Sequence, residues 1–364
     1  MQIGLQLLCQ SWGYDSSVTD SKVYEEELKL AVRCDELGYD LAGVVEHHFE
    51  DYSFCPDNFV YLANLAAKTR QVKLMTGAVI VPWNDPLRVA EKAALLDEMS
   101  GGRLILGLGR GLSRREYNQF GIDMDSSRER FDEATPMILK ALETGVMEEH
   151  HGKFYQQPRA VIRPKPTRSF RERLCQVAMS GDSVIEAAHN RAKMMQFTYK
   201  PLETHKTEVG IYAAEYRKQH KTAPPVPFFI DLTVVDTDSA RCEKFARKHI
   251  IDYLLSVMHH YEMMGEHFAN AKGYSEYGET AAAMRAAGLE AVAEGYLATQ
   301  AYGTPQQMLD KIEARRQVVG DFDLLVCFRF AGIPFEAAMR SCETFGKHVI
   351  PELRSMGMAE TLAA

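Results

Sequence analysis

The chain has 364 residues, 46% of them hydrophobic, and a formal charge of −8 that is spread without long runs of one sign. This composition favours a globular protein with a large core and excludes nucleic acid or an anionic membrane as the expected main partner. No stretch reaches the roughly 18 apolar residues that a membrane span needs. The N-terminal residues lack the basic and apolar regions of a signal peptide, so we expect a cytoplasmic protein.

The seven cysteines are an odd number, and no two of them stand at C-x-x-C spacing. This pattern predicts neither a disulfide framework nor a zinc site. We therefore expect cysteine and metal chemistry to play no part in the function.

Eight short apolar runs recur along the chain. They cover residues 3–8, 41–46, 72–81, 103–108, 174–179, 194–199, 226–235 and 322–329. The runs are nearly continuous rather than alternating, which is typical of parallel strands that are buried on both faces. Between them the spacing of apolar residues and the turn residues predict helices, among them 21–37, 57–69, 86–99, 127–143 and 304–319.

Eight strands alternating with helices predict a single (β/α)8 barrel over residues 1–364, with an open doubly wound sheet as the alternative. Two long segments, 109–173 and 237–303, interrupt the alternation after strands 4 and 7. Long loops in compact domains are often lids, so residues 262–295 are the candidate lid. A surface ornament or a dimer contact is the alternative interpretation of these insertions.

The first candidate functional group is a histidine pair at the end of the second strand, in Glu46-His47-His48. In a barrel, sites form at the carboxyl ends of the strands, and histidine suits proton transfer near neutral pH. Alternation along a strand places Glu46 and His48 on one side and His47 on the other, so the three cannot share a metal ion. A ligand-contacting histidine and a packed structural histidine both remain open.

The second candidate is the glycine cluster at 107–111, which contains Arg110. Its G-x-G-x-G spacing is not the dinucleotide fingerprint, because position 112 is leucine. Glycines beside an arginine at a strand end suit close approach of the backbone to a flat or anionic ligand. A tight turn that requires glycine is the alternative.

The third candidate is the corner at 180–183, between the fifth strand and its helix. Backbone N–H groups at a helix start, with the hydroxyls of Ser180 and Ser183 beside them, can form an anion site. An ordinary N-cap by Asp182 or Ser183 is the competing explanation. Arg110 and Arg128 could supply positive charge, and together these features suggest a ligand with a phosphate and a flat, partly apolar body.

Several of these segments together resemble the bacterial luciferase family, in particular its catalytic subunit. They are 46–49 (EHHF), 76–82 (TGAVIVP), 95–103 (LLDEMSGGR), 107–112 (GLGRGL), 120–128 (FGIDMDSSR), 177–181 (VAMSG) and 303–306 (GTPQ). The resemblance implies a (β/α)8 barrel that binds reduced FMN and activates O2 as a C4a-peroxyflavin. It also implies a separate flavin reductase that supplies FMNH2, and a homodimer that forms through helices near 57–69.

The resemblance also implies roles for particular residues. His47 matches the catalytic histidine, an acid or base near the flavin C4a, and Arg110 and Arg128 match arginines that bind the phosphate. The other positions implied to contact the flavin are Gly77 and Ala78, joined by a cis peptide under the ring, Gly109, and the strand-5 loop with Met179, Ser180, Gly181 and Ser183.

Three positions depart from the luciferase pattern. Gly109 stands where the luciferase subunit has a reactive cysteine, Met179 where it has a glutamate, and Ser183 where it has a threonine. These changes are compatible with flavin binding, but they do not predict light emission or a preference for long-chain aldehydes.

The sequence thus predicts an FMNH2-dependent monooxygenase of a two-component system that oxidises a small apolar compound such as an aldehyde or ketone. An F420-dependent oxidoreductase and a non-catalytic flavin-binding paralogue are the alternatives. We expect Trp12, Phe49, Phe54 and Trp83 to line the substrate cavity, with ordinary core packing as the alternative for each.

Overall fold

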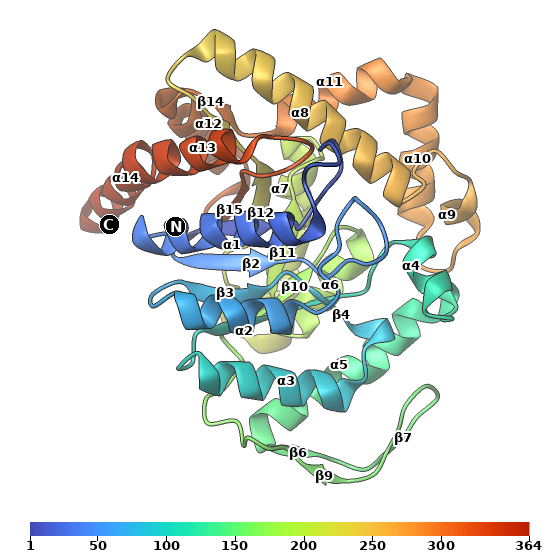
Figure 1. The fold of residues 1–364 in the computed structure, drawn as a ribbon. Coiled ribbons are helices and arrows are strands. Elements are labelled where there is room, and N and C mark those ends of the chain that lie inside the picture. Colours follow the sequence, from blue (N-terminus) through green and yellow to red (C-terminus); the bar gives the residue numbers. More distant parts are fainter. Residues whose placement is uncertain (364) are drawn as a thin grey trace.

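Within residues 1–363, which the computed structural model describes, eight parallel strands close into a ring (Figure 1). In order around the ring they are β1 (Ile3–Leu7), β2 (Leu41–Val44), β3 (Lys73–Thr76), β5 (Leu104–Gly109), β10 (Leu174–Val177), β11 (Lys193–Phe197), β12 (Phe228–Leu232) and β15 (Asp323–Cys327). Strand β15 pairs with β1, and β5 pairs with β10, so the ring has no free edge. The predicted barrel is confirmed, and the open sheet is wrong.

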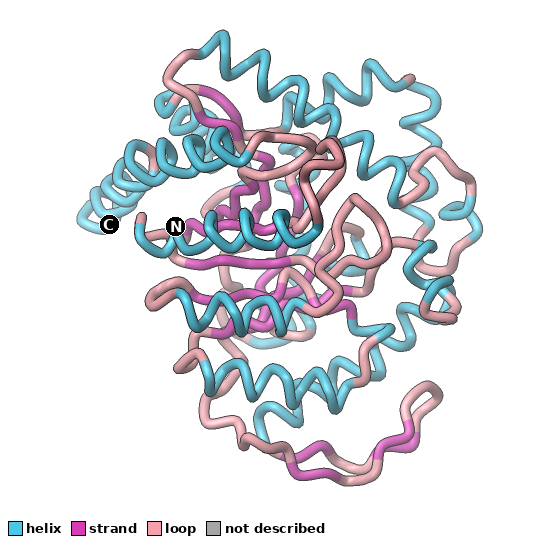
Figure 2. The backbone as a smooth tube through the Cα atoms, in the orientation of Figure 1, coloured by secondary structure: helices cyan, strands magenta, loops and turns pink. Residues whose placement is uncertain are grey.

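The main helices pack around the outside of the ring (Figures 1 and 2). They are α1 (Asp20–Glu36), α2 (Asn58–Lys68), α3 (Pro86–Met99), α5 (Ser127–Thr144), α6 (Gly181–His189), α7 (Leu202–His220), α12 (Pro305–Val319), α13 (Phe335–His348) and α14 (Ile350–Ala363). Local signals explain their ends. For example, α12 begins with a capping box between Thr304 and Gln307, has Pro305 in its first turn, and ends at Gly320, whose φ is +84°.

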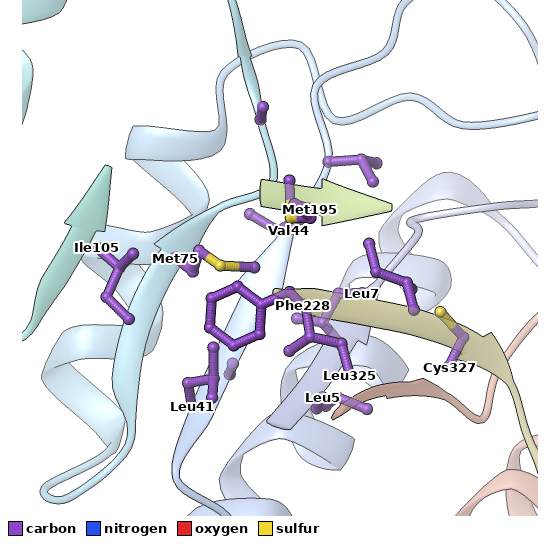
Figure 3. Packing of buried hydrophobic residues seen from close by; sticks show 14 of the residues in the cluster. Leu5, Leu7, Leu41, Val44, Met75, Ile105, Met195, Phe228, Leu325 and Cys327 are labelled. Atoms are coloured by element: carbon purple, nitrogen blue, oxygen red, sulfur yellow. The ribbon is translucent and has the colours of Figure 1, made fainter. Parts of the chain in front are cut away.

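The core fills the ring and the space between the strands and helices. Every residue of β1, β2, β5, β12 and β15 is buried. Figure 3 shows part of the cluster, with Met75, Phe228 and Leu325 among the side chains inside it. Burial of one such side chain stabilises the fold by about 1.5–3 kcal/mol, which explains why the strand sequences are nearly continuous apolar runs.

Two excursions extend the barrel after its fourth and seventh strands, as predicted. The first contains α4 (Arg114–Gln119), η2 (Met124–Ser126), and two short ribbons that pair β6 (Val146–Met147) with β9 (Ala160–Val161) and β7 (His150–His151) with β8 (Gln156–Gln157). The second contains β13 (Val234–Val235), α8 (Ser239–His260), α9 (His267–Asn270), α10 (Ser275–Ala287), α11 (Leu289–Thr299) and β14 (Tyr302–Gly303). Among the described helices, none is both long enough and apolar enough to cross a membrane.

Candidate active site

A cavity of about 220 Å³ opens where the barrel strands end, under helices α8, α10 and α11. Most of the residues predicted to contact a flavin line it. They are His47, Gly77, Ala78, Gly109, Arg110, Met179 and Ser183. Arg128, Ser180 and Gly181 do not line the cavity but lie on or against the start of α6.

The floor of the cavity is backbone rather than side chain. The peptide between Gly77 and Ala78 is cis, and it precedes β4 (Val79–Ile80) and η1 (Val81–Trp83). Below it the Gln6 amide donates to the Gly77 carbonyl at 3.5 Å, and a Cβ on Gly77 would lie 2.9 Å from that amide. Glycine at position 77 therefore allows the backbone to pack directly against the Gln6 amide. Gln6 is a buried polar residue that sequence analysis did not identify. A Cβ on Gly109 would point toward Ala78 and Ile80, at 3.4 and 3.2 Å.

His47 lies at one side of this floor, with 14% of its side chain exposed. Its Nδ1 is 3.1 Å from Oε1 of Glu116, and its Nε2 is 3.4 Å from the Tyr261 hydroxyl. The backbone N–H of His48 donates to the same Glu116 oxygen at 2.8 Å. Burial raises the pKa of Glu116, but the contacts with His47 and His260 outweigh burial and hold that pKa well below its usual range. Glu116 is therefore an ionised carboxylate beside the imidazole.

Glu46 and His48 lie together, as predicted, but both follow the end of β2 at Val44, and Glu46 lines the same cavity as His47. Nε2 of His48 is 3.4 Å from Glu46 Oε1. Glu46 also accepts hydrogen bonds from the indole of Trp83 at 2.7 Å and from the Asn84 amide at 2.9 Å. The Glu46 carboxylate therefore connects the end of β2 to the segment after β4. These contacts fix the backbone next to His47.

Arg110 and Arg128 lie at different distances from the cavity. The Arg110 guanidinium packs 4.2 Å from the centre of the Tyr274 ring, and its Nη1 is buried without a hydrogen-bond partner among the described residues. Arg128 donates to Glu186 at 2.6 Å in a neighbouring cleft, and its Nη2 is likewise buried without a hydrogen bond in the described chain. Two guanidinium nitrogens therefore make no hydrogen bond among the described residues, although Arg128 Nη2 lies 3.8 Å from the Asp182 carboxylate.

The corner between β10 and α6 is capped differently from the prediction. Ser180, not Asp182 or Ser183, is the N-cap of α6, and the Ser183 hydroxyl accepts the Ser180 N–H at 2.9 Å. The N–H of Gly181 instead donates to both carboxylate oxygens of Glu276, at 3.1 and 3.0 Å. Glu276 is on α10, far along the chain, and no sequence pattern linked it to this corner. An anionic group thus already occupies the α6 N-terminus, where a phosphate was predicted.

The expected aromatic lining is wrong. Trp12, Phe49, Phe54 and Trp83 do not line the cavity; Phe49 is 61% exposed, and Trp83 packs on Phe120 while its indole binds Glu46. The wall comes instead from the second excursion and is rich in tyrosine and methionine. Its members are Tyr253, Leu254, Val257, Met258, Tyr261, Met263, Tyr277, Met284 and Tyr296. The cavity is thus apolar opposite the glycine floor, and the predicted lid segment 262–295 supplies part of this wall.

The whole arrangement matches one family of proteins. A family model described as luciferase-like monooxygenase matches residues 1–321. The chain belongs to this family.

Relatives within the family include enzymes with different names. The chain is 36% identical over 150 residues to the oxygenase component of the flavin-dependent trigonelline monooxygenase of Acinetobacter baylyi, covering 41% of each chain. It is 34% identical over 133 residues to the alkanal monooxygenase alpha chain of Aliivibrio fischeri, covering 36% of this chain and 37% of the relative. The matched segments thus span about two fifths of these curated relatives.

Solved structures share the fold over nearly the whole chain. The monooxygenase RslO1 from Streptomyces bottropensis has a TM-score of 0.76 and 25% identity, covering 97% of this chain and all (100%) of that chain. The oxygenating constituent of 3,6-diketocamphane monooxygenase of Pseudomonas putida, in complex with FMN, has a TM-score of 0.74 at 18% identity, with 96% and 98% covered. An F420-dependent secondary alcohol dehydrogenase has a TM-score of 0.71 at 17% identity, with 95% and 97% covered. The last two likenesses show the fold alone.

Proposed function

We propose that this protein is the FMNH2-dependent oxygenase component of a two-component monooxygenase that oxidises a small apolar substrate, such as an aldehyde or ketone. The observation that carries the proposal is one cavity lined by the glycine floor, by an imidazole held on a carboxylate, and by Arg110, whose buried Nη1 makes no hydrogen bond among the described residues. A separate flavin reductase would supply FMNH2, in line with the name of the Acinetobacter baylyi relative as an oxygenase component.

The residues fit a flavin mononucleotide. Arg110 Nη1 makes no hydrogen bond in the described chain, and the Gly181 N–H at the nearby corner becomes available to a phosphate once the Glu276 carboxylate is displaced. Burial, followed by a hydrogen bond to Asp132, raises the pKa of Glu186 to about 8. Arg128 Nη2 lies 3.8 Å from the Asp182 carboxylate and makes no hydrogen bond among the described residues, so it is the second donor that an anion could use. The bare floor at Gly77, Ala78 and Gly109 would lie against the isoalloxazine ring.

Bound FMNH2 would supply the two electrons, so that substrate, O2 and FMNH2 give oxygenated substrate, FMN and water. The contribution of the chain is binding and proton control. His47, held by Glu116 through Nδ1, presents Nε2 toward the cavity, where it can hold or release one proton. The tyrosine and methionine wall excludes water from the reacting groups.

The function is tested by mixing the purified protein with photoreduced FMN without oxygen, and then with aerated buffer. We expect the absorbance of oxidised FMN to return more slowly than it does for free FMNH2, because the cavity is sheltered from water. With a panel of aldehydes and cyclic ketones in ¹⁸O2, one labelled oxygen atom should enter the product. Reoxidation as fast as that of free FMNH2 would contradict the proposal. Hydride transfer from reduced F420 without O2 would favour the deazaflavin alternative.

Replacement of Glu276 by glutamine should tighten FMN binding. The phosphate must displace the Glu276 carboxylate from the Gly181 N–H, and a neutral amide opposes it less. We expect the Kd for FMN to fall about tenfold, which corresponds to ~1.4 kcal/mol, and the Kd for riboflavin, which has no phosphate, to stay unchanged. Fluorescence titration of both ligands measures this.

Glu279 offers a matched control, because it is exposed on the same helix about one turn further on. Its replacement by glutamine should leave both affinities unchanged. If E276Q tightens riboflavin as much as FMN, the carboxylate does not compete with the phosphate.

The homodimer stays a prediction, as does the cytoplasmic location. Helix α2 packs its apolar side on the barrel and leaves Val60 68% exposed, with Asn64 and Ala67 also exposed. This outer face of α2 is where we infer that a second copy binds.

A further inference from the structure

A chain of alternating acids and bases leads from His47 away from the cavity. Glu116 joins His47 to His260, since its Oε2 is 3.8 Å from His260 Nε2. Nδ1 of His260 lies 2.8 Å from Oε2 of Glu50, and Glu50 forms an ion pair with Arg115. One ring nitrogen of His47, one ring nitrogen of His260 and one carboxylate oxygen of Glu116 all lie within 4.8 Å of one another. Imidazoles and carboxylates therefore alternate along the chain of contacts, which ends at the guanidinium of Arg115.

His260, the last residue of α8, is fully buried at the centre of this chain. Its ring stacks on Tyr52, with centroids 4.4 Å apart and an interplanar angle of 15°, and meets His47 edge-on at 5.2 Å. Nε2 has no hydrogen-bond partner among the described residues, although it points toward the Glu116 carboxylate. Burial of a polar nitrogen without a hydrogen bond destabilises the folded protein. A proton on Nε2 would reduce this cost, because the nearby Glu116 carboxylate attracts it.

The protonation state of the ring follows from this placement. A neutral imidazole has one donor nitrogen and one acceptor nitrogen, so it can satisfy only one of two carboxylates. The doubly protonated ring donates toward both Glu50 and Glu116. Burial raises the pKa of Glu50, but Arg115 and His260 outweigh it and lower that pKa, so Glu50 is also an ionised acceptor.

We propose that His260 is a positioning residue for His47: a buried imidazolium between Glu50 and Glu116 that aims the Glu116 carboxylate at Nδ1 of His47 and leaves Nε2 of His47 facing the cavity. His47 is then the Nδ1–H tautomer, with its lone pair toward the reacting groups. The catalytic value of this tautomer rests on the proposed function, but its existence does not.

The charges act on His47 in opposite directions. The His260 imidazolium repels a second proton on His47, whereas the Glu116 carboxylate attracts it. The ring centroids of His47 and His260 are 5.2 Å apart, whereas Nδ1 of His47 is only 3.1 Å from the Glu116 carboxylate. The other titratable groups around His260 are Glu50 and Tyr52 after β2, Arg115 on α4, and Tyr253, His259 and Tyr261 on or next to α8.

The test uses the apoprotein with ¹⁵N-labelled histidine rings, whose NMR shifts report the protonation of each nitrogen. Resonances are assigned from H47Q and H260Q. In the wild-type protein at neutral pH we expect His260 to carry protons on both nitrogens and neutral His47 to carry its proton on Nδ1. A neutral His260, or a His47 protonated on Nε2, overturns the proposal even if no variant can be made.

The variants then separate positioning from simple support. His260→Gln should reduce the share of neutral His47 that carries its proton on Nδ1, because Glu116 is then no longer held toward that atom, and Glu116→Gln should reduce this share at least as much. The matched control is His259→Gln, because His259 is the neighbouring residue on α8, exposed, and in contact with Arg115 and Trp12. H259Q should leave the tautomer of His47 unchanged. An unchanged tautomer in H260Q, or a change in H259Q as large as that in H260Q, overturns the proposal, whereas failure of the oxygenation assay alone would not.

Discussion

Replacement of His47 by glutamine should lower turnover of the FMNH2-dependent reaction by about 10²–10⁴-fold, the range typical for loss of a general acid or base. Glutamine keeps the approximate size and polarity of the side chain but cannot gain or lose a proton. FMN affinity should stay unchanged, because the phosphate donors are assigned to Arg110 and the start of α6, whereas His47 is hydrogen-bonded to Glu116. Product formation under saturating FMNH2, together with an FMN titration, measures both.

His48 provides the matched control for this prediction. It is the adjacent residue and also a histidine, but its ring contacts Glu46 and does not line the cavity. H48Q should therefore retain most of the turnover. If H47Q turns over as fast as the wild-type protein, the assignment of His47 as the proton-handling group is wrong.

The barrel could be predicted because its physical signal is local. A strand that is buried on both faces must be apolar along its length, and eight such runs can be counted without knowing their partners. The exact breaks could not be predicted from the same signal. The run at 72–81 contains β3, the cis peptide at Gly77 and β4, and the run at 226–235 contains β12 and β13. An apolar run shows burial, and it does not show where hydrogen bonding between strands stops.

The place of His47 at a strand end facing the cavity was also predictable, since sites in a barrel form at the carboxyl ends of the strands. Its partners were not. Glu116 lies 69 residues away and enters from the short helix α4, while His260 ends the long helix α8. Neither residue has a spacing that links it to His47. Their approach is a result of tertiary packing, so only the structure shows that the imidazole rests on a carboxylate.

The prediction of the residues that line the cavity was wrong for a related reason. The sequence prediction chose aromatic residues near strand ends, whereas the structure uses tyrosines and methionines from α8, α10, α11 and the turns between them. Such residues on a helix are ordinarily read as core positions. That they face a cavity depends on how the insertion folds back over the barrel, which no local pattern records.

Replacement of Arg110 by methionine should weaken FMN binding by about 10–100-fold, in line with ~1.5–3 kcal/mol for hydrogen bonds to a charged group. Methionine preserves the apolar contact with Tyr274 but removes the donors, including the unpartnered Nη1. Riboflavin affinity should change little, because riboflavin offers no phosphate. Comparison of the two Kd values in the same variant therefore separates a phosphate contact from a general loss of the cavity.

Arg128→Met is the informative comparison, since both arginines were predicted to bind the phosphate. Arg128 lies in the neighbouring cleft, where its Nη1 donates to Glu186 and its Nη2 lies 3.8 Å from the Asp182 carboxylate. We therefore expect a smaller loss of FMN affinity for R128M than for R110M. A larger loss for R128M would mean that the phosphate lies on the α5 side of the corner, with Arg110 serving mainly to hold Tyr274 and α10 against the barrel.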